Sequence, residues 1–73
     1  MIKKIGITPP VITLGQFLKH TGIIDTGGQA KWFLQENIVF VNGEEENRRG
    51  RKLALGDQID IPEVGQFEIV EES

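Results

Sequence analysis

Four basic residues lie within five positions of this chain, in the run RRGRK at residues 48–52. An arginine guanidinium binds phosphate oxygens in a fork and keeps its charge at any relevant pH. Gly50 leaves the backbone free to follow a nucleic-acid surface. The alternative is a solvated loop whose charges offset three glutamates at residues 44–46. Because the run follows an Asn-Gly turn and could share a surface with Lys19 and Lys31, we favour phosphate binding.

Trp32 is a large aromatic side chain outside the apolar stripe of the helix expected to contain it. Each residue of a helix turns by about 100°, so Trp32 lies about 150° from the centre of the stripe formed by Ala30, Phe33 and Leu34. One explanation is a stacking platform for a base or a ribose. The other is that the indole covers another segment, such as Pro9-Pro10. The sequence supports the two explanations about equally.

Few side chains could support catalysis. A nucleophile, a base and oxyanion donors would have to lie close together. His20 is the only histidine, and its place at the end of a short helix is explained by a favourable interaction with the helix dipole. The glutamates at 44–46 are expected to be solvated on a hairpin arm. With no phosphate-loop or dinucleotide pattern, we expect neither an enzyme nor a small-molecule substrate.

Composition argues against several other classes of protein. With no cysteine and one histidine, the chain cannot build a thiolate or histidine metal site, and we expect neither a metal nor a cofactor. The longest apolar runs fall far below the roughly 20 residues that span a bilayer. The start, MIKK, lacks an apolar core of signal-peptide length. A cytoplasmic protein without membrane contact is therefore expected.

Charge is distributed unevenly along the chain, whose 73 residues predict a single domain spanning 1–73. The formal net charge of −3 argues weakly against a nucleic-acid partner, which requires a basic surface. From residue 57 onward there are six acidic residues and no basic one, whereas residues 1–35 contain four lysines and one aspartate. A dipolar molecule of this kind can present a local positive patch.

Two Thr-x-x-Gln signals, starting at Thr13 and Thr26, each match a capping box at the start of a helix. Apolar stripes with helical spacing follow both, and Gly22 is a plausible C-terminal stop for the first helix. We predict helices at residues 13–19 and 27–36. Because the two signals are 13 residues apart, the connection is short and the helices are expected to pack as a hairpin.

Alternating apolar and polar residues predict strands at 38–41, 58–61 and 66–70. The pair Asn42-Gly43 predicts a hairpin turn, with a weak return strand at 44–47. An N-terminal arm at residues 1–8 is too apolar for a free tail, and we expect it to add a strand beside 66–70. The predicted class is α+β, with a two-helix hairpin packed on a small, mostly antiparallel sheet.

The order of these elements is similar to that of a known RNA-binding family. The matching pieces are the stripe Leu14, Phe17 and Leu18, the segment Gln-Ala-Lys at 29–31, the Val-x-Val-Asn-Gly strand and turn at 39–43, and the Gly-Asp at 56–57 before an alternating strand. Together they make residues 12–61 resemble the ribosomal-protein S-four RNA-binding domain, or α-L motif. The small free-standing members of the YaaA and YbcJ type are the most similar.

This resemblance implies binding of structured RNA, such as ribosomal or transfer RNA, by the two helices, the hairpin and the adjacent loop. Three positions that are often basic in the family hold Thr13, Gly27 and Phe40 here, which leaves more of the positive charge to the loop. Carried onto this chain, the RNA-binding residues are Lys19, Gln29, Lys31, Trp32, Arg48, Arg49, Arg51 and Lys52.

Two other partners are compatible with the sequence. A protein-interaction module could dock a protein on its acidic sheet side or on exposed aromatic residues without touching RNA. Double-stranded DNA is a weaker candidate, because no predicted helix is suited to reading the major groove. Salt dependence separates RNA binding from apolar docking, because counterion release makes RNA affinity fall steeply with salt.

Overall fold

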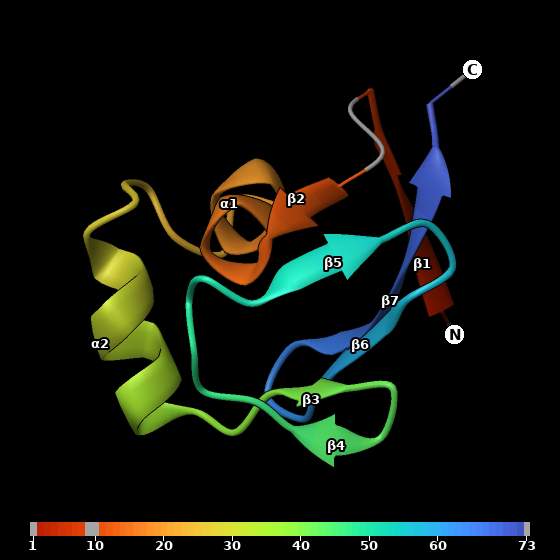
Figure 1. Ribbon diagram of the computed structural model, residues 1–73. Helices are drawn as coiled ribbons and strands as arrows, with labels where there is room; N and C mark the ends of the chain where they lie inside the picture. The colour runs from red at the N-terminus through yellow and green to blue at the C-terminus, as the bar shows by residue number, and fades with distance from the viewer. Residues whose placement is uncertain (1, 9–10, 73) are drawn as a thin grey trace.

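A computed structural model describes residues 2–8 and 11–72 of the chain. Two short helices lie to one side of two β-sheets (Figure 1). In chain order the elements are β1 (Ile2–Ile7), β2 (Val11–Thr13), α1 (Leu14–His20), α2 (Gln29–Glu36), β3 (Phe40–Val41), β4 (Glu44–Glu45), β5 (Lys52–Ala54), β6 (Gln58–Ile61) and β7 (Gly65–Glu71). Pro9-Pro10, which the sequence offered as a segment that Trp32 could cover, lie outside the described residues.

The larger sheet has five strands in the order β1-β7-β6-β3-β4, and β2 pairs with β5 in a separate two-stranded sheet. Only the β1–β7 pair is parallel, so the α+β class with a mostly antiparallel sheet is confirmed. The N-terminal arm adds its strand beside β7 as predicted, with Lys4 opposite Glu68. Parallel pairing is possible here because almost the whole domain forms the connection between these two strands.

The core lies between the large sheet and the helices. Period-two alternation places Ile5 and Ile7 of β1 on the same buried face as the apolar residues of β6 and β7. Phe17 of α1 meets Phe67 of β7 edge to face, with ring centroids 5.5 Å apart. The other buried apolar residues are Leu14, Leu18, Ile24, Ala30, Leu34, Val39, Val41, Leu53, Ile59, Ile61 and Ile69.

The first capping box forms as predicted. Of the second, only the hydrogen bond from the Thr26 N–H to the Gln29 carboxamide forms. The Thr13 hydroxyl accepts a hydrogen bond from the Gln16 N–H at 3.2 Å, and the Gln16 carboxamide accepts from the Thr13 N–H at 2.9 Å. In α2 the N-cap is Gly28, which makes no side-chain hydrogen bond. The prediction of a Thr26 cap was therefore wrong, because the chain makes another turn through the two glycines before the helix begins at Gln29.

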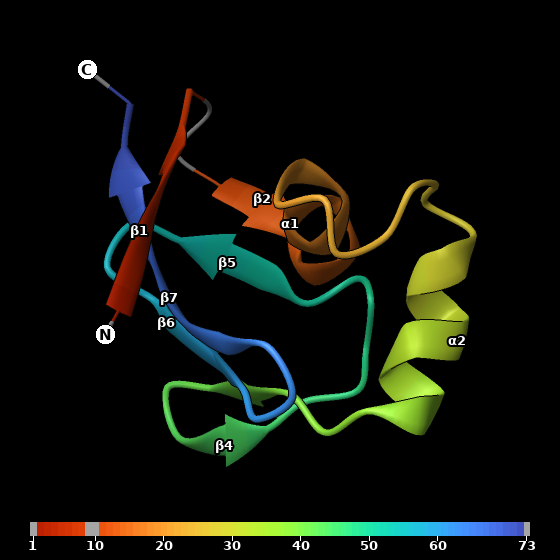
Figure 2. The same cartoon turned by 180° about the vertical axis from the view of Figure 1, so that it is seen from behind.

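The helices cross steeply, since α1 is seen nearly end-on where α2 is seen from the side (Figures 1 and 2). Residues 21–28 connect them, and Gly22 ends the first helix in a left-handed conformation at φ +81°. Close packing of the pair as a hairpin, which the spacing predicted, is not confirmed.

The strands around the Asn-Gly turn are shorter than predicted. Asn42 and Gly43 adopt positive φ angles of 53° and 85°, as a two-residue hairpin requires. The paired strands on either side cover only β3 and β4, and one further hydrogen bond in the same register joins the Glu46 N–H to the Val39 carbonyl at 2.8 Å. Strands β2 and β5 were not predicted, since three residues are too few to show an alternating pattern.

Candidate nucleic-acid interface

The basic loop, at residues 46–51, is fixed to the start of α1 through its backbone. The Arg51 carbonyl accepts a hydrogen bond from the Leu14 N–H at 2.7 Å, and the Arg49 carbonyl accepts from the Gly15 N–H at 2.9 Å. These are first-turn N–H groups that have no partner within the helix. A Cβ atom at Gly15 would lie 3.4 Å from the Arg49 carbonyl oxygen, at the short end of van der Waals contact, so the loop packs directly against this turn of α1. The loop therefore follows the helix rather than moving independently.

Glu46 organises the side chains of the loop. Glu46 is only 7 % exposed. Its carboxylate accepts hydrogen bonds from the Arg48 Nε at 2.9 Å, the Arg48 Nη2 at 3.2 Å and the Arg51 Nη1 at 2.8 Å. The Arg48 backbone N–H donates to the same carboxylate at 3.1 Å. Hydrogen bonds from Arg48, and then from Arg51, lower the pKa of Glu46 to about 2.

This arrangement corrects the expectation that the glutamates at 44–46 are all solvated. Glu44 and Glu45 are exposed on β4, but Glu46 is buried. The reason is that Glu46 stands opposite the buried Val39 in the continued hairpin register, so its side chain lies on the buried face, where Arg48 and Arg51 bind it. A buried carboxylate is tolerated there because two guanidinium groups satisfy it.

Arg48 and Arg51 therefore differ from Arg49 in their availability. The Arg48 side chain is 73 % exposed and the Arg51 side chain 32 % exposed, and both are committed to Glu46. The carboxylate also raises the pKa of Arg48. Together Glu46, Arg48 and Arg51 carry a net charge of +1. Arg49 makes no ion pair within the described residues, so its full charge faces outward.

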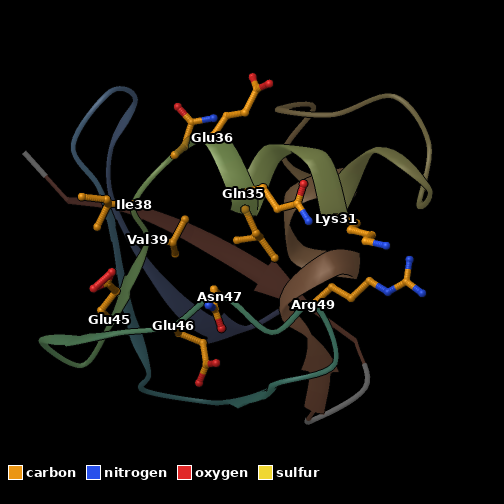
Figure 3. Close-up of a pocket in the computed structure, with 11 residues that line it drawn as sticks. Lys31, Gln35, Glu36, Ile38, Val39, Glu45, Glu46, Asn47 and Arg49 are labelled. Atoms are coloured by element: carbon orange, nitrogen blue, oxygen red, sulfur yellow. The ribbon is translucent and has the colours of Figure 1, made fainter.

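Arg49 lies where two surface hollows meet. One hollow is bordered by Lys19 of α1, by Gly27 before α2 and by the loop itself at Arg49 and Gly50. The other is bordered by Lys31 of α2 and again by Arg49. Figure 3 shows the Lys31 and Arg49 side chains at the same end of this second hollow. The fold thus brings together three cations from α1, α2 and the loop, which are far apart in sequence.

Three other predicted site residues do not border the two hollows: Gln29, Lys52 and Trp32. The Gln29 carboxamide oxygen accepts from the Asp25 and Thr26 N–H groups at 2.6 and 3.0 Å, so this side chain ties down the turn before α2. Lys52 is exposed on β5, paired in register with Thr13. Trp32 is 65 % exposed, so most of its indole covers none of the segments described.

Other kinds of site find no support in the described part of the chain. Residues 2–8 and 11–72 contain no group of three histidine, aspartate or glutamate side chains that could hold a metal ion. Among the same residues, no helix is long and apolar enough to cross a membrane. His20 is exposed at the end of α1, as its helix-dipole explanation requires.

Sequence reasoning found the cations but missed Glu46 and Gly15, which position them. The available signal for Glu46 was its spacing of two and five residues from Arg48 and Arg51. That spacing indicates a contact only if the chain bends back after Glu46, so that both arginines reach one carboxylate. For Gly15, the signal was a glycine in the first turn of a helix, where it lowers helix propensity without an obvious local benefit.

Comparison with known proteins gives one family and one similar relative. The S4 domain family matches residues 5–70. The chain is 53 % identical over 70 residues to the "Probable ribosome maturation protein RlbA" of Bacillus subtilis (strain 168), in a match that covers 96 % of this chain and 99 % of the relative. The family match extends beyond the core motif at 12–61 and includes the second half of β1 and all but the last residue of β7. From its sequence and its fold, the chain belongs to the S4 domain family.

Proposed function

We propose that the protein is a non-catalytic RNA-binding protein that recognises structured RNA, with ribosomal RNA as the first candidate. The observation that carries the proposal is the convergence of Lys19, Lys31 and Arg49 around two adjoining hollows on an otherwise acidic protein. These three cations make no ion pair within residues 2–8 and 11–72, and converging positive charges attract a phosphate backbone. Membership of the S4 domain family supports this proposal.

In the proposed mechanism, side chains rather than a helix N-terminus bind the phosphates. The first N–H groups of α1 are already donated to the carbonyls of Arg49 and Arg51, so they are not free for a ligand. Arg49 contacts phosphate at the centre, between Lys19 and Lys31. Lys52 and the exposed parts of Arg48 and Arg51 extend the contact at lower strength, since the charge of Glu46 is nearby.

Trp32 and Gln29 would supply contacts to sugars and bases at the outer side of α2. The exposed indole can stack on an unpaired base at the edge of a folded RNA. The Gln29 oxygen is occupied by backbone donors, which leaves its amide nitrogen to donate to a ribose hydroxyl or a base edge. The two crossed helices and the loop would then act together as one RNA-facing surface.

The acidic residues of the last segment would orient the protein on the RNA. Six carboxylates from residue 57 onward have no basic neighbour in sequence, and they lie on or beside β6 and β7. Phosphates are repelled by this side and attracted by the other, so electrostatics selects one docking orientation.

The printed name of the RlbA relative supports a ribosomal partner. At 53 % identity over nearly the full length of both chains, we propose that this protein also works in ribosome maturation, in the cytoplasm. The test is to crosslink the protein to RNA in its native cell and sequence the attached RNA. Enrichment of ribosomal RNA segments is expected, whereas recovery of no RNA above background would contradict the proposal.

A protein-interaction module is the second candidate, favoured by one feature of the large sheet. A hollow on this sheet is bordered by Ile2, Phe40 and Phe67 together with Asp60, and Ile2 is 47 % exposed. An apolar surface with an acidic rim can bind a protein. Such binding would change little with salt, whereas RNA binding would weaken steeply.

A further inference from the structure

The second hollow has properties that phosphate binding alone does not explain. It is a groove of about 730 Å³ between α2 and the segment at residues 45–49 (Figure 3). Sites for small ligands commonly have volumes of about 300–1,000 Å³.

The two ends of the groove have opposite charge. Lys31 and Arg49 lie at one end, while Glu45 lies toward the other (Figure 3). The last residue of α2, Glu36, also borders the groove, where the helix dipole adds negative potential. Glu46 borders the groove too, but Arg48 and Arg51 neutralise it. A ligand that fits this pattern is anionic at one end and carries hydrogen-bond donors at the other.

Apolar and carboxamide groups lie between these ends. Val39 and Leu34 are 1 % and 5 % exposed, whereas Ile38 is 55 % exposed. A flat ring could cover Ile38 and gain apolar contact. The side chains of Gln35 and Asn47 make no hydrogen bond within the described residues, so both can bind a ligand edge.

We propose that this groove is a pocket for a single unpaired RNA nucleotide, an inference that rests on the proposed function. The phosphate of the nucleotide binds Lys31 and Arg49, and its base lies over Ile38 with an edge toward Asn47 and Glu45. A base with an exocyclic amino group is favoured, because carboxylates only accept hydrogen bonds. A duplex does not fit, since its second strand would bring phosphates to the acidic end.

The test uses three hairpin RNAs that share one loop and the same base pairs. The first stem is fully paired, the second has one unpaired adenosine inserted, and the third has one unpaired uridine inserted. The wild-type protein is expected to bind the adenosine hairpin at least about fivefold more tightly than the paired one, as one base contact would give. The uridine hairpin should show a smaller preference, because uracil has no amino group.

Two variants locate the effect in the groove. Ile38→Ser and Asn47→Ala should each reduce the adenosine preference while leaving binding to the paired hairpin unchanged. Val64→Ser is the matched control, since Val64 is 51 % exposed and lies outside the groove; it should keep the preference. Circular dichroism confirms that each variant is folded.

The possible failures are distinguishable. If the wild-type protein binds all three hairpins equally and its affinity falls with salt, the pocket is overturned and RNA binding stands. If Val64→Ser loses the preference as fully as Ile38→Ser does, the pocket assignment is also overturned. If no hairpin is bound above background, the proposed function fails together with the pocket.

Discussion

The acidic hairpin of β6 and β7 and the basic loop at residues 46–51 are held in place by different interactions. The hairpin has a regular ladder, in which Ile59 pairs with Phe67, and its alternate side chains are buried in the core. Within the described residues, the loop has no ladder of its own. It is held by the Glu46 carboxylate and by the N–H groups of Leu14 and Gly15.

The comparison shows two ways in which charge is placed on this small protein. On the hairpin, apolar burial positions the backbone, and the carboxylates of Asp60, Glu63, Glu68 and Glu71 make no hydrogen bond within the described residues. In the loop, one buried carboxylate determines where the arginines point. Removing a charge should therefore have little effect on the hairpin and a clear effect on the loop.

The largest expected effect is a loss of stability caused by a cavity in the hairpin of β6 and β7. Ile69 is 0 % exposed, and Ile69→Ala should lower the free energy of unfolding by about 2–5 kcal/mol. Val70→Ala, the next residue on the opposite face of β7, should cost less because Val70 is only half-buried. Urea unfolding measures both. Equal losses would mean that burial on one face does not hold this strand.

The next effect is the loss of the loop's carboxylate. Glu46→Ala removes both ion pairs and should lower the free energy of unfolding by about 1–2 kcal/mol, since the two arginines can recover solvent. Glu44→Ala is the control, because Glu44 is exposed on β4, and it should change the stability by less than about 0.5 kcal/mol. If the two variants are equally stable, the loop does not depend on Glu46.

A smaller effect is expected from the exposed indole. Trp32→Ala should weaken RNA binding by about fivefold, as the loss of one stacked base would. The slope of log affinity against log salt should stay the same, because stacking releases no counterions. Stability should hardly change, since Trp32 is 65 % exposed. A drop in stability without a change in affinity would show that the indole is structural.

The smallest expected effect is a pH dependence of stability that arises from the Glu46 carboxylate and is absent near neutral pH. The pKa of Glu46 falls from an ordinary 4.5 to about 2 in the folded protein. A lowered folded-state pKa contributes stability above pH 4.5, and this contribution is lost as the pH falls toward 2. The difference in melting temperature between wild type and Glu46→Gln should be constant from pH 8 to 5 and should shrink below that. A difference that grows in acid would contradict this assignment.

The sequence predicted the hairpin side better than the loop side, for a physical reason. Alternation at 58–61 and 66–70 is a local pattern, and burial of Ile59, Ile61 and Ile69 follows directly from it. The capping box at Thr13 is equally local and was also confirmed. The strand β5 depends on pairing with the distant β2, and the burial of Glu46 depends on the course of the backbone after the hairpin. A short alternating pattern contains neither.

For the candidate site, the sequence named the cations but could not rank them. Arg48, Arg49 and Arg51 look equivalent in the run RRGRK. The structure separates them, because Glu46 engages the first and the third and leaves Arg49 between two hollows. Lys19 and Lys31 border these hollows, and their binding of RNA stays a prediction.

The most direct test of the account is the salt dependence of RNA binding in Arg49→Ala, with Glu71→Gln as the control on the acidic side. The account predicts that Arg49→Ala weakens binding to the paired hairpin and reduces the slope of log affinity against log salt by about one unit. Glu71→Gln should leave the slope unchanged and the affinity equal or slightly higher. An Arg49→Ala variant that is folded and keeps both its affinity and its salt slope would contradict the account.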